Sequence, residues 1–144
     1  MSNKILVALD GSDGSKRALS AAVAHAKLTN SDLVLAYVID WSPYSFHTPQ
    51  ELEERHKRRE SEIQRANDSI LTPEKENLKS EGINVETVVH HGRIAETLLE
   101  LCDQHGASQI YTGRQGESRV HAMIFGSVSA ALVQTSSVPV TVVP

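Results

Sequence analysis

The sequence predicts a single α/β domain built on an open, mostly parallel sheet of five strands with helices on both faces. Apolar runs of strand length alternate with segments whose apolar residues recur at helical spacing, which is typical of βαβ units. The first run, residues 4–9, is almost continuously apolar, as a strand buried on both faces requires. The chain has 144 residues, of which 40% are hydrophobic, and this suffices for one substantial core.

Five segments have the length and composition of strands. They are residues 4–9, 33–39, 85–90, 109–112 and 138–143. The last begins at Val138, ends at Val143 and is expected at an edge of the sheet. Because it carries no charge, it predicts a homodimer in which it pairs antiparallel with the same segment of a second subunit. The alternative is that these residues are apolar only because helices of one subunit cover both faces.

Apolar spacing also predicts helices over residues 18–26, 94–102 and 128–132. Ser12 or Ser15 is available to cap the first helix. Gly106 stands where the left-handed residue that ends the second helix is expected. Cys102, the single cysteine, lies among leucines of the second helix. We therefore expect a buried thiol without a redox task and no internal disulfide.

The segment 41–82 differs in composition from the rest. Residues 41–49 contain two prolines and three aromatic residues and predict a loop, whereas residues 49–67 are dense in charges of both signs and predict a solvated helix. Glutamates are interleaved with the basic residues, which argues against a nucleic-acid patch. Thr72-Pro73 predicts a cap followed by a first-turn proline, where the helix breaks and restarts.

The most specific pattern is Gly113-Arg114-Gln115-Gly116, then nine residues, then Gly126-Ser127. Glycine adopts positive φ at little cost and lets a ligand oxygen approach the main chain. Two glycine-dependent turns around one loop therefore indicate a site for phosphate.

A helix that begins at Ser127 would turn its free N–H groups and positive dipole end toward this loop, with the amide of Val128 among them. The hydroxyl of Ser127 adds a further polar group. Arg114 either pairs with phosphate or is an ordinary solvent-facing arginine.

This glycine pattern, between a short strand and a helix, resembles the nucleotide-binding signature of the universal stress protein family, and every motif position matches. The resemblance covers the whole chain and departs from the family at Gln109, where relatives commonly have aspartate. It implies a Rossmann-like, adenine nucleotide alpha hydrolase-like fold, ATP as ligand and dimerisation through the last strand. It also implies that Asp10 contacts the ribose side of the nucleotide and that the main chain of Val38 contacts adenine.

The cofactor-binding residues implied in this way share one edge of the predicted sheet. They are Asp10, Val38, Gly113, Arg114, Gly116, Gly126, Ser127 and Val128. Asp10 has a simpler interpretation as a residue that shapes the Asp-Gly turn or caps the helix. His90-His91 does not predict a metal site, since neighbouring strand residues point to opposite faces and no third ligand is evident.

Binding of ATP without fast turnover is the preferred function, in a stress-response regulatory module. The sequence has no P-loop lysine motif, no Gly-x-Ser-x-Gly elbow and no Cys-His constellation, and no group that orients water is evident. Mg²⁺ is expected to bridge the phosphates, mainly with water ligands. The alternatives are a slow nucleotide hydrolase or phosphoryl-transfer enzyme on the same fold, and a relative that has lost its ligand.

Charge and hydropathy restrict the partners and the location. A net charge of −4 and a pI near 5.9 give no general reason to expect nucleic-acid binding. No run approaches the length of a membrane span, and the N-terminus lacks the apolar region of a signal peptide. We therefore expect a cytoplasmic protein without membrane insertion.

Overall fold

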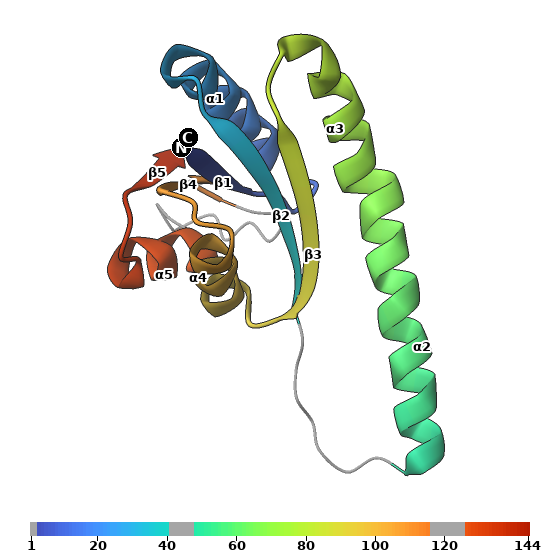
Figure 1. The fold of residues 1–144 in the computed structure, drawn as a ribbon. Coiled ribbons are helices and arrows are strands. Elements are labelled where there is room, and N and C mark those ends of the chain that lie inside the picture. The colour runs from blue at the N-terminus through green and yellow to red at the C-terminus, as the bar shows by residue number, and fades with distance from the viewer. Residues whose placement is uncertain (1–2, 41–47, 116–125) are drawn as a thin grey trace.

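The centre of the fold is a five-stranded sheet in which all neighbouring strands are parallel, in the order β3-β2-β1-β4-β5 (Figure 1). The computed structural model describes residues 3–40, 48–115 and 126–144. The strands are β1 (Lys4–Ala8), β2 (Asp32–Asp40), β3 (Val85–Gly92), β4 (Gln109–Gly113) and β5 (Val140–Val143). The predicted fold class is confirmed, and each predicted strand is present with one or both ends displaced by one or two residues.

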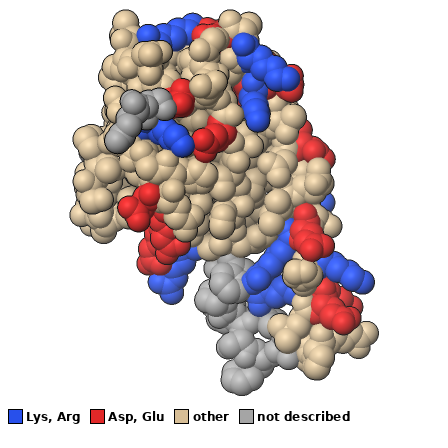
Figure 2. Space-filling model, in the orientation of Figure 1, with Lys and Arg blue, Asp and Glu red and all other residues tan. Residues whose placement is uncertain are grey.

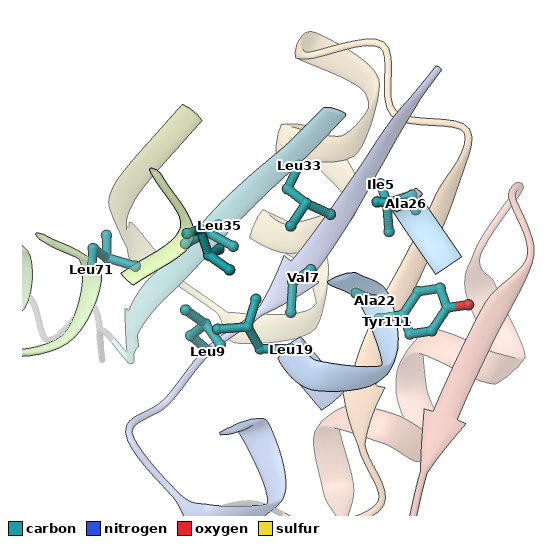
Figure 3. Packing of buried hydrophobic residues seen from close by; sticks show 11 residues of the cluster. Ile5, Val7, Leu9, Leu19, Ala22, Ala26, Leu33, Leu35, Leu71 and Tyr111 are labelled. Carbon is teal, nitrogen blue, oxygen red and sulfur yellow. The ribbon is translucent and has the colours of Figure 1, made fainter. Parts of the chain in front are cut away.

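Side chains of the central strands alternate between two apolar clusters, one on each face of the sheet. Odd-numbered residues such as Val7 and Leu35 pack beneath α1 (Asp13–Thr29) and α3 (Thr72–Leu78) (Figure 3). Even-numbered residues such as Leu6 and Val34 pack beneath α4 (Ile94–Gln104) and α5 (Ser127–Thr135). This explains the nearly continuous apolar run of the first strand, because both of its faces are buried.

The charged middle segment forms α2 (Pro49–Ala66), which continues through a π-helical turn, Asn67–Leu71, into α3 and a short 3₁₀ turn, Lys79–Glu81. Its start is a capping box that joins Thr48 and Glu51, with Pro49 in the first turn. Only Ala66 of α2 is buried, and on the face in Figure 2 Lys and Arg alternate with Asp and Glu along this helix. The predicted solvated helix is confirmed.

The predicted cap and helix break at Thr72 are wrong, although α3 begins at Thr72 with Pro73 in its first turn, as predicted. Thr72 has helical angles, φ −61° and ψ −45°, and its N–H donates to the carbonyl of Asn67 across the π turn. Proline lacks an N–H and its ring collides with the carbonyl four residues back in a regular helix. The wider π turn accommodates the ring, so the chain stays helical without a cap at Thr72.

The helix α4 ends as the sequence predicts. Gly106 follows it with φ +68°, the left-handed geometry that favours glycine. Cys102 is 4% exposed, and its thiol donates to the carbonyl of Ala107 at 3.4 Å. Burial raises the pKa of the Cys102 thiol. The expected buried cysteine is confirmed.

The last strand begins later than predicted, at Val140. The hydroxyl of Ser136 lies 3.1 Å from the N–H of Val138 and 2.8 Å from its carbonyl, so Val138 is bound in a local turn. The strand β5 lies at an edge of the sheet, as expected.

Within the described ranges, no helix is long and apolar enough to cross a membrane. The cytoplasmic location stays a prediction.

Candidate functional site

A cavity of about 400 Å³ lies where β1, β2 and β4 end and where α1, α4 and α5 begin. Strand order reverses between β1 and β4, and in open parallel sheets this is where ligands bind. Its wall contains all the described residues that the sequence predicts for the site. They are Asp10, Val38, Gly113, Arg114, Gly126, Ser127 and Val128. Gly116 lies outside the described residues. The structure thus brings these residues together, and their contacts with a nucleotide stay a prediction.

Asp10 lies in the turn between β1 and α1. Its carboxylate accepts a hydrogen bond from the N–H of Ser12 at 2.9 Å and a second, very short one from the Ser12 hydroxyl. The Ser12 hydroxyl in turn caps α1 by accepting from the N–H of Ser15 at 3.2 Å. Gly11, with φ +82°, completes the turn. Asp10 therefore shapes the Asp-Gly turn, as the simpler interpretation of this residue predicts. It also lines the cavity.

Val38 has main-chain groups that open on the cavity. The N–H of Leu9 donates to the carbonyl of Ala36 at 2.8 Å, so Ala36 points its main-chain groups toward β1. Alternate residues of a strand share this direction, and Val38 therefore does the same. No hydrogen bond within the described part of the chain extends this ladder from Leu9 to Val38, because β1 ends at Ala8. The N–H and C=O of Val38 are thereby directed into the space beyond β1.

Gly113 is required by a close contact between two backbones. An added Cβ would lie 2.9 Å from the carbonyl carbon and from the carbonyl oxygen of Gly14, in the first turn of α1. A Cβ on Gly14 would lie 2.5 Å from the carbonyl oxygen of Gln115. Neither glycine has positive φ. The expectation of a φ > 0 turn at Gly113 is therefore wrong, and the reason for glycine there is that α1 packs against the end of β4.

Gly126 also departs from the expected geometry. It is the N-cap of α5 with φ −70° and ψ 167°, which any residue adopts. Its N–H donates to the carbonyl of Arg114 at 2.7 Å. Any contact of Gly126 with a phosphate must therefore be made without its N–H. The N–H groups available to a phosphate are those of the residues that follow.

Ser127 and Val128 occupy the first turn of α5, where helical N–H groups have no partner within the helix. Both line the cavity, and Ser127 is exposed. The amides and the helix dipole make this end of the cavity suited to an anion. Arg114 adds the one positive charge of the described wall, against the carboxylates of Asp10 and Asp40.

Several residues of the site were not predicted from the sequence. Gly14 lies against Gln115, and Ser129 lines the cavity and bonds to Arg114. Because these contacts join positions far apart along the chain, no local pattern indicates them. Asp40 lines the cavity as the last residue of β2. The sequence could have indicated Asp40, since it is the first charged residue after an apolar strand.

The adjacent histidines do not form a metal site in the described part of the chain. His91 Nε2 lies 2.9 Å from Glu62 Oε2, which ties β3 to α2, and His90 is exposed. Among the described residues, no group of three or more His, Cys, Asp or Glu side chains is arranged to hold a metal ion.

Comparison with known proteins identifies relatives over the full length of the sequence. The family model described as the universal stress protein family matches residues 1–144. The universal stress protein YxiE of Bacillus subtilis is 33% identical over 150 residues, which cover 99% of each chain. The structure of the universal stress protein UspA from Lactobacillus plantarum superposes with a TM-score of 0.84 at 26% identity, covering 99% of this chain and 97% of that chain.

Two further solved structures contain nucleotides. A universal stress protein in complex with cAMP has a TM-score of 0.64 at 24% identity and covers 99% of this chain and 97% of its own. A universal stress protein from Archaeoglobus fulgidus in complex with dAMP has a TM-score of 0.60 at 16% identity and covers 100% of this chain and 98% of its own. At these identities both structures support the fold alone.

Proposed function

The chain belongs to the universal stress protein family, and we propose that it binds ATP as a nucleotide-dependent regulatory module of the stress response. One observation carries the proposal. A single cavity of about 400 Å³ joins the open main-chain groups of Val38 to the free amides of Ser127 and Val128. Such a cavity is of the size that small-molecule sites have in proteins. Two structurally similar universal stress proteins bind adenine nucleotides, cAMP in one and dAMP in the other.

The nucleoside is assigned to the Val38 side of the cavity. A neighbouring N–H and C=O on one strand edge match the acceptor and donor that adenine presents on its Watson–Crick edge, whereas guanine presents the reversed pattern. ATP is therefore preferred to GTP. Asp10, fixed by its two hydrogen bonds to Ser12, faces the ribose from the neighbouring strand end.

The phosphates are assigned to the start of α5. The amides of Ser127 and Val128 and the side chain of Arg114 supply donors and positive charge there. Mg²⁺ accompanies the nucleotide, bound through phosphate oxygens and water, since this ion retains much of its hydration shell in proteins.

Competition binding with ATP and GTP tests this proposal. We expect a preference for ATP of about tenfold or more, because a reversed hydrogen-bond pattern leaves two buried groups without partners. Asp10→Asn should weaken ATP binding by about tenfold, since a hydrogen bond to a charged group contributes about 1.5–3 kcal/mol. Asp13→Asn, an exposed aspartate in the same helix start, is the matched control and should leave the affinity unchanged. Equal affinities for ATP and GTP would rule out recognition of the base at Val38.

The fate of bound ATP separates a regulatory module from a slow nucleotide hydrolase or phosphoryl-transfer enzyme. Purified protein is incubated with labelled ATP and Mg²⁺ for hours, and the nucleotide is then separated by chromatography. Phosphoryl transfer requires a group that positions the nucleophile, and no group that orients water is evident in the sequence. We therefore expect intact ATP to be retained. Steady release of ADP would instead identify an enzyme.

We also propose a homodimer through β5. The N–H of Ile110 donates to the carbonyl of Pro139, so the main-chain groups of Val140 and Val142 point away from β4 toward the free edge. Antiparallel pairing about a two-fold axis at Thr141 joins Val140 of one copy to Val142 of a second copy. The other edge, β3, is longer but carries Glu86 and His90.

Replacing Thr141 and Val143 by lysine tests the dimer. Like charges then face each other across the axis, so the mass measured by sedimentation should fall to that of a monomer. His90→Lys, at an exposed position of the opposite edge strand, is the control and should leave the mass unchanged. A wild-type monomer, or a double variant with the mass of the dimer, would contradict this interface.

A further inference from the structure

Ser129 lies in the first turn of α5 and was not predicted as part of the site. Its residue surface is only 2% exposed. Its hydroxyl donates to the carbonyl of Arg114 at 2.9 Å and lies 3.1 Å from the carbonyl of Gly126, three residues earlier in the chain. A hydroxyl has one hydrogen, and the shorter contact is the one to Arg114. The side chain therefore joins the first turn of α5 to Arg114, the residue that follows β4.

The main chain of Arg114 is held on both sides. Its N–H donates to the carbonyl of Val143 in β5 at 2.7 Å. Its carbonyl accepts from the N–H of Gly126 at 2.7 Å and from the Ser129 hydroxyl. Both lone pairs of this carbonyl are thus engaged by the start of α5. These bonds fix Arg114, which lines one wall of the cavity, relative to the amides of Ser127 and Val128, which line another.

We propose that Ser129 is a positioning residue for the phosphate end of the site. Its hydroxyl holds the Arg114 carbonyl and so sets the distance between the Arg114 side chain and the free amides of α5. The hydroxyl is buried and already hydrogen-bonded, so it acts through Arg114 and Gly126 rather than on the ligand. This inference rests on the proposed function, and it predicts a defect that depends on the phosphates and spares the nucleoside.

The variant Ser129→Ala tests this role through two ligands that differ only in their phosphates. We expect ATP to bind about threefold to tenfold more weakly, the range of one net hydrogen bond, and adenosine to bind as in the wild type. In the ligand-free variant, the amide hydrogen of Gly126 should exchange faster with solvent, because its acceptor has lost the second bond that holds it. The unchanged adenosine affinity shows that the variant is folded.

Ser136→Ala is the matched control. Ser136 follows the last turn of the same helix, and its hydroxyl also bonds to main-chain groups, those of Val138, away from the cavity. It should change neither the ratio of ATP to adenosine affinity nor the exchange of Gly126.

Three outcomes for Ser129→Ala overturn the inference: unchanged ATP affinity, equal weakening of ATP and adenosine, or unchanged exchange at Gly126. A wild-type protein that binds neither ligand overturns the proposed function instead. In that case the exchange rate of the Gly126 amide hydrogen still tests whether the Ser129 hydroxyl holds the Arg114 carbonyl.

Discussion

The two ends of the sheet use the same kinds of polar groups in opposite ways. At the amino ends of the strands, Glu86 Oε1 lies 3.0 Å from Lys4 Nζ and Glu86 Oε2 lies 3.0 Å from His105 Nδ1. The N–H of Ser108 closes this end further by donating to the carbonyl of Lys4 at 2.9 Å. The charged side chains at this end are thus paired with one another, and the main-chain groups are hydrogen-bonded to one another.

At the carboxyl ends, polar groups converge on the cavity instead. The main chain of Val38 and the amides of Ser127 and Val128 face it from different elements. The difference follows from topology. Each helix that crosses between parallel strands runs back along the sheet, so helix N-termini gather at the carboxyl ends and helix C-termini at the other. The connectivity itself makes only one end receptive to anions.

The largest effect is expected where the end of β4 packs against the first turn of α1. Gly113→Val places a branched side chain against the main chain of Gly14, with the first added atom 2.9 Å away. Overpacking of backbone against backbone should lower the free energy of unfolding by about 3 kcal/mol. ATP affinity should fall by more than about tenfold, as the walls of the cavity separate. Urea unfolding and nucleotide titration measure the two effects.

Gly82→Val serves as the control for Gly113→Val. Gly82 has φ +72°, so the substitution is strained, but an added Cβ there meets nothing within 4 Å. A cost of about 1 kcal/mol with unchanged ATP affinity is expected. Equal stability and affinity in Gly113→Val and the wild type would mean that α1 and β4 are not held in this contact.

An intermediate effect is expected for Gly14→Ala, on the other side of the same contact. Alanine favours a helix over glycine by about 1 kcal/mol, but its Cβ would lie 2.5 Å from the Gln115 carbonyl oxygen. The clash should outweigh the gain, with a net loss of about 1–2 kcal/mol in unfolding free energy and weaker ATP binding. Lys16→Ala, at an exposed position of α1, should be nearly neutral. A stabilised Gly14→Ala protein would show that the loop after β4 moves aside freely.

The smallest effect is expected at the amino end. Hydrogen bonds from Lys4 and His105 lower the pKa of the Glu86 carboxyl. A carboxyl with a depressed folded pKa stabilises the fold above its unfolded pKa and loses this contribution as pH falls through the folded pKa. Since the Glu86 side chain is 49% exposed, solvent screening limits its contribution at neutral pH to about 0.5 kcal/mol.

Glu86→Gln should remove this small contribution at pH 7 and make a smaller difference near pH 3, because the contribution is lost as the pH falls through the lowered folded pKa of Glu86. Unfolding in urea at the two pH values measures it, with Glu100→Gln on the exposed side of α4 as control. ATP affinity should be unchanged in both variants. A loss of affinity in Glu86→Gln would contradict the independence of the two ends.

Features that depend on neighbours along the chain could be predicted from the sequence alone. Apolar periodicity indicated all five strands and the parallel sheet, because burial on one or both faces restricts residue choice locally. The cap at Ser12 and the left-handed Gly106 were also predictable, since each satisfies groups within a few residues. Seven residues of the cavity wall, from Asp10 to Val128 along the chain, were indicated by the glycine pattern and the ends of the predicted strands.

The reasons why those residues are needed emerge only in the folded protein. Gly113 is glycine because Gly14 lies against it, and Gly126 uses its N–H for Arg114 rather than for a ligand. The Ser129 hydroxyl bonds to the carbonyl of Arg114, which also accepts from Gly126. Thr72 does not cap a helix, because the π turn before it accommodates Pro73. Close approach of two backbones and the sharing of one acceptor depend on positions far apart in sequence, so no local pattern records them until folding brings those positions together.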